Sequence, residues 1–380
     1  MLYKIVLLLI ALQISFINCY AAEPKMPQEL KQLLSKISSK NHENNMSLED
    51  VMLLLSKKLS EKTVMPLNIQ TIDQDNYLLY ERDAPLSRMA SKNTNKIETH
   101  CTVKHISNDG VSKNIHTLKN INLFQITKMY KVNNNKYIAV GYEQDITKHS
   151  IHQAVAMLVD ETGKTLWKTI VGTTKSYSEA MVATYNDNYI VVGHDFVWDN
   201  PDKSYGNYQL MVSKVTKKGK KLWTKHYSTN GRFAKGRNIE KTKDDGFIII
   251  GETQDKAWIF KIDAFGEKVW EVFLDTPKTA DRAYAIADNH KDGYIIAGHS
   301  NGIYPDYAKA WIIKITYSGK IALNIPAPLQ KHFTIQTVNQ INSNEFILTG
   351  FYSSYNSYSS FFMKIDSAGK KVSEKIVQLK

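Results

Sequence analysis

Six positions in this sequence differ in residue type although they occupy the same place in a repeated pattern. Each stands ten residues before an aromatic residue that begins an apolar stretch, and the six are Leu67, Thr127, Glu179, Arg237, Tyr284 and Gln336. A carboxylate, a guanidinium and a phenol brought together could bind a polar ligand or exchange protons with it. The alternative is that these side chains make only local contacts at the ends of strands.

Two sets of residues are therefore candidates for ligand binding. The first combines members of the variable series with two neighbouring charged residues, giving Glu179, Arg237, Asp281, Arg282, Tyr284 and Gln336. The second is an aromatic-rich segment, expected to be a loop, that contains Tyr352, Tyr355 and Tyr358 between serines. Tyrosine and serine together suit adaptable recognition of sugars or protein surfaces.

Motifs of known enzyme classes do not account for these residues. The sequence contains no GxSxG, HExxH, P-loop or CxxC pattern. His194 and His299 follow Gly193 and Gly298 at the same place in the repeat. We interpret these histidines as packing or strand-end residues, and we predict no metal site and no cofactor.

The elements that carry the candidate residues are short strands. An aromatic residue, an apolar run and usually a glycine recur, as in Phe247–Gly251 and Tyr294–Gly298. A second stretch ends in a turn glycine, and these glycines recur about every fifty residues. Eight residues before each aromatic lies an apolar residue, and this apolar series is Ile69, Met129, Met181, Ile239, Ile286 and Val338.

Four strands in each of six repeats predict an all-β fold, a six-bladed β-propeller of four-stranded blades over residues 64–380. A single small sheet cannot bury both of its faces, whereas sheets packed around an axis can. Tryptophans that follow three of the turn glycines, Trp167, Trp223 and Trp270, are expected to pack between blades. Since residues two apart share a face, the variable series is expected one layer above the apolar series, at the mouth of the central channel.

Two stretches of this pattern resemble a known family. Glu161–Trp167 is similar to the TGxxxW-type repeat of quinoprotein-dehydrogenase-like propellers, the PQQ-like repeat superfamily. Asp292–Gly298 looks like a blade of secreted bacterial propellers. The resemblance implies the fold. The chain has no adjacent cysteines of the kind that cover the quinone in the enzymes, so the resemblance is to members without enzymatic activity.

The beginning of the chain predicts export. Residues 1–22 contain Lys4, an apolar stretch and then small residues, the arrangement of a signal peptide. Lipid attachment at Cys19 is an alternative, although Asn18 stands where a small residue is expected. Residues 23–63 are expected to form a short helical extension. No later stretch has the length and apolarity of a membrane span.

These observations favour a secreted or periplasmic scaffold that binds a protein partner or an anionic or carbohydrate ligand of a cell envelope or host surface. The formal net charge of +12 is spread along the chain, so nucleic acid is not expected as a partner. The alternative is a hydrolase or lyase acting at the channel mouth. An enzyme should bring several titratable groups with shifted pKa into one pocket, such as Glu179 and Arg237 with a histidine around one deep cavity.

Overall fold

The described residues form 24 strands in six antiparallel sheets, each built from four consecutive strands. The computed structural model describes residues 64–71, 76–83, 99–107, 112–121, 125–133, 135–144, 151–198, 206–229, 233–254, 256–274, 280–289, 291–301, 309–326, 333–342, 344–354, 357–368 and 370–378. The predicted signal peptide, the helical extension and Tyr355 lie outside these ranges. The part of the chain that is described contains no helix able to cross a membrane.

The strands of the first three blades have the following bounds. Blade 1 comprises β1 (Val64–Thr71), β2 (Asn76–Asp83), β3 (Thr99–Ser107) and β4 (Ser112–Ile121). Blade 2 comprises β5 (Gln125–Asn133), β6 (Lys136–Gln144), β7 (His152–Asp160) and β8 (Thr165–Ile170). Blade 3 comprises β9 (Ser176–Ala183), β10 (Tyr189–Trp198), β11 (Gly206–Val215) and β12 (Lys221–Tyr227).

The last three blades repeat the arrangement. Blade 4 comprises β13 (Ala234–Lys241), β14 (Phe247–Thr253), β15 (Lys256–Ile262) and β16 (Lys268–Leu274). Blade 5 comprises β17 (Ala280–Asp288), β18 (Gly293–Asn301), β19 (Lys309–Thr316) and β20 (Ile321–Pro326). Blade 6 comprises β21 (Phe333–Asn342), β22 (Glu345–Ser354), β23 (Ser357–Asp366) and β24 (Lys371–Gln378).

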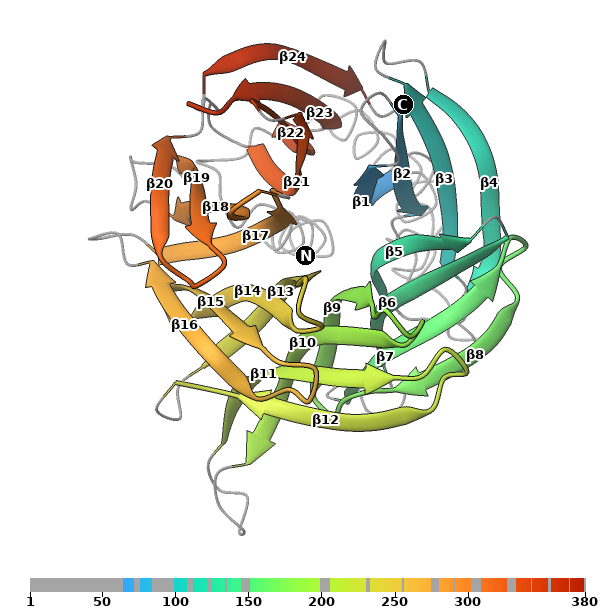
Figure 1. Ribbon diagram of the computed structural model, residues 1–380. Helices are drawn as coiled ribbons and strands as arrows, with labels where there is room; N and C mark the ends of the chain where they lie inside the picture. The colour runs from blue at the N-terminus through green and yellow to red at the C-terminus, as the bar shows by residue number, and fades with distance from the viewer. Residues whose placement is uncertain are drawn as a thin grey trace, which may run out of the picture. The chain divides into compact units, whose positions relative to one another are not determined.

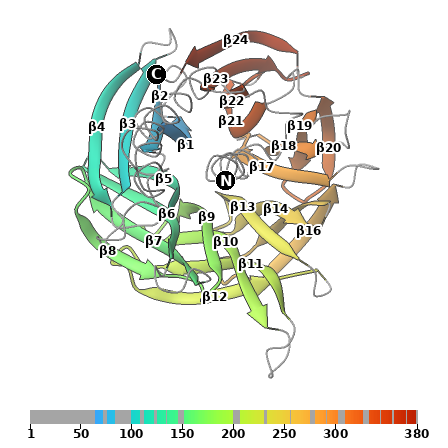
Figure 2. The same ribbon diagram turned by 180° about the vertical axis from the view of Figure 1, so that it is seen from behind.

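The first strands of the six blades surround a central axis. Each contacts the first strand of the next blade, and contact between β21 and β1 closes the ring. Figure 1 shows the colours running around this ring in chain order, and Figure 2 shows the same ring from behind. The prediction of a six-bladed propeller with four-stranded antiparallel blades is confirmed.

Turn glycines and tryptophans join neighbouring blades. Gly219, between β11 and β12, has a φ of +84°, which favours a residue without a side chain. The ring of Trp167 from blade 2 packs on this turn, so a Cβ at Gly219 would stand 2.8 Å from the ring. Trp270 of blade 4 packs on Gly319 of blade 5 in the same way. The expectation that the tryptophans lie between blades is confirmed.

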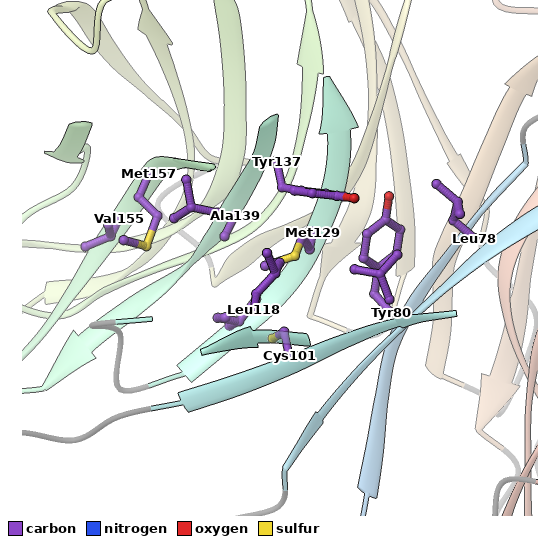
Figure 3. Close-up of a cluster of buried hydrophobic side chains, with 12 residues drawn as sticks. Leu78, Tyr80, Cys101, Leu118, Met129, Tyr137, Ala139, Val155 and Met157 are labelled. Carbon is purple, nitrogen blue, oxygen red and sulfur yellow. The ribbon is translucent and has the colours of Figure 1, made fainter. Parts of the chain in front are cut away.

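The hydrophobic core lies in the seams between blades rather than at one centre. Figure 3 shows the seam of blades 1 and 2, where Tyr80 and Leu118 meet Met129 and Tyr137. Burying one face of each sheet against the next gives every blade two covered faces. The apolar series is buried in all six first strands, and its members are Ile69, Met129, Met181, Ile239, Ile286 and Val338.

Candidate functional site

A β-bulge marks the variable series in every blade. In each first strand, pairing with the second strand skips the member of the variable series, namely Leu67, Thr127, Glu179, Arg237, Tyr284 or Gln336. In β5 and β21 the pairing skips a second residue as well. A bulge re-aims a side chain and bends the strand, and bulges are frequent beside functional sites. The simple alternation that placed these residues one layer above the apolar series does not hold, because the extra residue interrupts it.

Two of the bulged residues meet in an ion network between blades 3 and 4. Arg237 Nη2 lies 2.6 Å from Glu252 Oε1, and Arg237 Nη1 lies 3.6 Å from Glu179 Oε1. Arg282 from β17 reaches the same buried carboxylate, with Nε 2.6 Å from Glu252 Oε2. The side chain of Glu252 is only 3% exposed, so its charge depends on these two guanidinium groups.

Aromatic rings border this network on both sides. The Tyr284 ring lies 5.6 Å from Arg237 Cζ and stacks on His299 at 4.7 Å. On the other side, His194 stacks on Tyr177 at 4.8 Å, and its Nδ1 lies 3.8 Å from Glu179 Oε1. Both histidines therefore lie within paired strands and stack on a tyrosine, and His194 also lies beside Glu179.

Sequence reasoning missed the most buried acid of the site. Glu252 directly follows Gly251 on β14, the same place in the repeat as His194 and His299. The preceding glycine is required here, because a Cβ at Gly251 would stand 1.9 Å from the Lys235 carbonyl oxygen. The repeat register that aligned the two histidines therefore contained the information needed to find Glu252.

The mouth cluster, as we name it, has more cations than acids among its described residues. Its members are Lys128, Glu179, His194, Lys235, Arg237, Glu252, Arg282 and Tyr284. Four are cationic groups, and two are carboxylates. Net positive charge concentrated in one cluster attracts anions.

Burial and crowding shift the pKa values of this cluster. Burial lowers the pKa of Lys128 to about 8, although Glu179 opposes the shift. Burial and then Arg237 lower the pKa of Lys235. Burial raises the pKa of Glu179, with Arg237 and Lys128 acting in the opposite direction. Burial, Lys235 and Arg237 hold the pKa of His194 well below its usual range, so the imidazole is neutral at pH 7.

The remaining predicted residues that the structure describes are Asp281, Gln336, Tyr352 and Tyr358. Asp281 is buried and accepts a hydrogen bond from Ser300, while Gln336 lines the central channel. Tyr352 and Tyr358 belong to strands β22 and β23, which stay paired as far as Ser354 and Ser357. The expected loop is therefore mostly a hairpin, because main-chain pairing continues almost to its tip.

The channel contains a cavity of about 370 Å³ between the first strands. Lys128 of the mouth cluster lines it, together with Gln336, Met181, Ile239 and, deeper along β13, Glu240. Burial raises the pKa of Glu240 to about 7. Among the described residues, no group of three or more histidine, cysteine, aspartate or glutamate side chains is placed to hold a metal ion.

Comparisons with known proteins show the fold. No protein-family model and no curated protein matches the chain. A solved protein of unknown function from Dyadobacter fermentans aligns with a TM-score of 0.52 and 10% identity, covering 83% of this chain and 94% of its own. One of unknown function from Bacteroides caccae gives 0.48 and 11%, covering 73% and 90%. A polysaccharide lyase described as an ulvan lyase gives 0.49 and 8%, with 82% of each chain covered. At 10% identity, the likeness to the Dyadobacter fermentans protein concerns the fold alone.

Proposed function

We propose that this protein is an exported binding protein whose propeller takes an anionic ligand at the channel mouth. The observation that carries the proposal is the surplus of cations in the mouth cluster. Two guanidinium groups pair with Glu252, and Lys128 and Lys235 add two further positive charges. Export rests on the signal-like sequence of residues 1–22. A non-enzymatic role agrees with the quinoprotein-like resemblance of Glu161–Trp167, which remains a prediction.

A bound anion would stabilise the charged forms of two lysines in the mouth cluster. Lys128 and Lys235 have lowered pKa values because burial and neighbouring charge disfavour their protonated forms. An anion placed between them would favour the protonated forms again. Binding would then be coupled to proton uptake above pH 8, since the ligand interacts more strongly with the charged lysine.

The test is calorimetric titration of the full chain with galacturonic acid, a carboxylated sugar, and with galactose as the neutral counterpart. We expect binding of the acid alone, with an affinity that falls as salt is added. Arg237→Met and Lys128→Met should weaken binding about tenfold, the loss of one charge-assisted contact. Lys218→Met, in an exposed turn between β11 and β12 on the opposite face, is the matched control. Equal affinity for the two sugars, or unchanged affinity in both site variants, would contradict the proposal.

An enzyme at the same place is the second candidate, and one observation favours it. The neutral imidazole of His194 lies beside Glu179 and Arg237, so a proton acceptor and a cation stand within one cluster. Lyase or hydrolase activity would produce new chain ends from polygalacturonate, detected as reducing sugar over time. The protein would be an enzyme rather than a scaffold if it released reducing sugar and if His194→Gln abolished this release while still binding galacturonic acid.

A further inference from the structure

A row of aromatic side chains continues from the mouth cluster along one face of blade 3. His194, Phe196 and Trp198 alternate along β10 and therefore share a face of the sheet. Tyr177 of β9 is paired opposite His194, and Tyr208 of β11 is paired opposite Phe196. The row thus leads from residues beside Glu179 to the outer end of β10.

The rings of this aromatic row touch in sequence. Tyr177 and His194 are 4.8 Å apart between centroids, and His194 and Tyr208 are 5.4 Å apart. Tyr208 and Phe196 follow at 5.3 Å, and Phe196 and Trp198 at 4.9 Å. Contacts at these distances hold each ring in a fixed orientation. His194 is buried, so the partly exposed rings of Tyr177, Tyr208, Phe196 and Trp198 form the preorganised surface of the row.

Cationic side chains lie over the same rings. Lys175 Nζ is 4.9 Å from the Phe196 centroid and 5.6 Å from that of Trp198. Lys235 Nζ is 5.9 Å from the centroid of Tyr208. Lys235 also belongs to the mouth cluster, so this lysine connects the cluster with the aromatic row.

The outer end of the row is open to solvent. Pairing between β10 and β9 ends at Asp195, whereas pairing with β11 continues to Trp198. Gly206 stands opposite Trp198 and has no side chain to cover its ring. Trp198 is 41% exposed, a large value for a side chain of this size.

We propose that the aromatic row binds successive sugar rings of an acidic polysaccharide, one of whose carboxylates occupies the mouth cluster. This inference rests on the proposed function and adds the ligand class and the path of the chain. Sugar rings present C–H faces that pack on aromatic faces, and Lys175 and Lys235 suit carboxylates along the chain.

The two acids of the mouth cluster favour a polysaccharide over a single-stranded nucleic acid. Nucleic acids also use aromatic rings and cations, but each nucleotide brings a phosphate charge. Glu179 and Glu252 repel phosphates and carboxylates alike, but sugar hydroxyls can donate hydrogen bonds to these two acids, and single-stranded DNA offers few such hydroxyls. An oligonucleotide is therefore the competitor in the test.

The experiment compares ligand length in full-chain variants by titration with galacturonic acid and with its hexamer. We expect the hexamer to bind more tightly than the monomer. Trp198→Ala should weaken hexamer binding about tenfold and leave monomer binding unchanged. Phe265→Ala, which removes a 77% exposed ring from a turn on the opposite face, should change neither. Thermal unfolding of Trp198→Ala should match that of the parent, since the ring is exposed.

Each outcome separates the two proposals. Equal affinity for monomer and hexamer, or unchanged hexamer binding in Trp198→Ala, would show that the aromatic row does not bind the polysaccharide. The proposal of an anion site in the mouth cluster would be unaffected. Absence of binding by either acid would overturn both. Tighter binding of a single-stranded oligonucleotide than of the hexamer, lost in the same variant, would replace polysaccharide with nucleic acid.

Discussion

Two seams of the propeller use polar residues at adjacent positions of the first strand for different purposes. In the seam of blades 1 and 2, Asn68 binds the main chain of the neighbouring strand twice, donating to Met129 O at 2.8 Å and accepting from Met129 N at 2.9 Å. In the seam of blades 3 and 4, Arg237 and Glu179 bind other charged side chains. The first arrangement fastens two strands, whereas the second gathers charged side chains from neighbouring blades.

The contrast teaches how to separate scaffold from site among buried polar groups. Gln70 repeats the behaviour of Asn68, since its Oε1 accepts from Lys131 N at 3.0 Å and from Tyr80 OH at 2.6 Å. Such groups have their hydrogen-bonding capacity filled by the fold itself. The mouth cluster instead contains more positive charge than its own acids neutralise, which leaves capacity for a ligand.

The largest expected effect on stability is in the seam of blades 1 and 2. Asn68→Ala should lower the free energy of unfolding by about 3 kcal/mol, because the buried amide and carbonyl of Met129 both lose their partner. Chemical denaturation measures the loss. Galacturonic acid binding by the folded variant should be unchanged, and a large loss of binding with little loss of stability would reverse the assignment of the two seams.

Arg237→Met should cost less stability, about 2 kcal/mol, because Arg282 still pairs with Glu252 and the site is partly open to water. A double-mutant cycle with Glu179→Gln isolates the interaction of the two side chains. We expect the second substitution to recover part of the stability lost in the first. Strict additivity would show that Glu179 and Arg237 do not interact.

The pH dependence of binding sharpens the role of Lys128. Its pKa is lowered from 10.5 to about 8, so the folded protein loses this charge as pH rises through 8. Anion affinity should therefore fall several-fold between pH 7 and 9. Lys128→Arg should keep its charge and show no such fall, and an unchanged profile in that variant would assign the titration to another group.

Glu240, deeper in the channel, should show the smallest effect. Burial raises its pKa from 4.5 to about 7, so between these values the folded state holds a proton that the unfolded state releases. Stability should then decrease as pH rises through this window. Glu240→Gln should remove this decrease and gain about 1 kcal/mol at pH 8, a discounted value because water reaches the channel. Thermal unfolding from pH 5 to pH 8 compares the two proteins.

The sequence was informative where structure is local and repeated. A turn glycine such as Gly219, or the run Phe247–Gly251, determines a hairpin through its own residues, and six copies make the propeller predictable. The variable series was found because the repeat could be aligned. The bulges at these positions were not predicted, because an extra residue in a strand leaves no trace in composition.

The pairing of charges was also beyond sequence reasoning. Glu252 and Arg282 belong to different blades, and only the closed ring brings them to 2.6 Å. Lys128 and Lys235 looked like ordinary members of a basic composition. The tyrosines of Tyr352–Tyr358 were assigned to a loop because alternating Ser and Tyr suits a strand end and a loop equally well.

Because each sheet is built from four consecutive strands, new chain ends could be placed between any two blades. Within the described chain the seam between β21 and β1 is closed by contact between blades, as the other seams are, with every strand remaining in its own sheet. A circular permutant that begins at β13 and joins β24 to β1 would therefore preserve all six sheets. The blades are interchangeable as units of assembly, and the charged seam of blades 3 and 4 could be moved to the chain ends without redrawing a single strand pair.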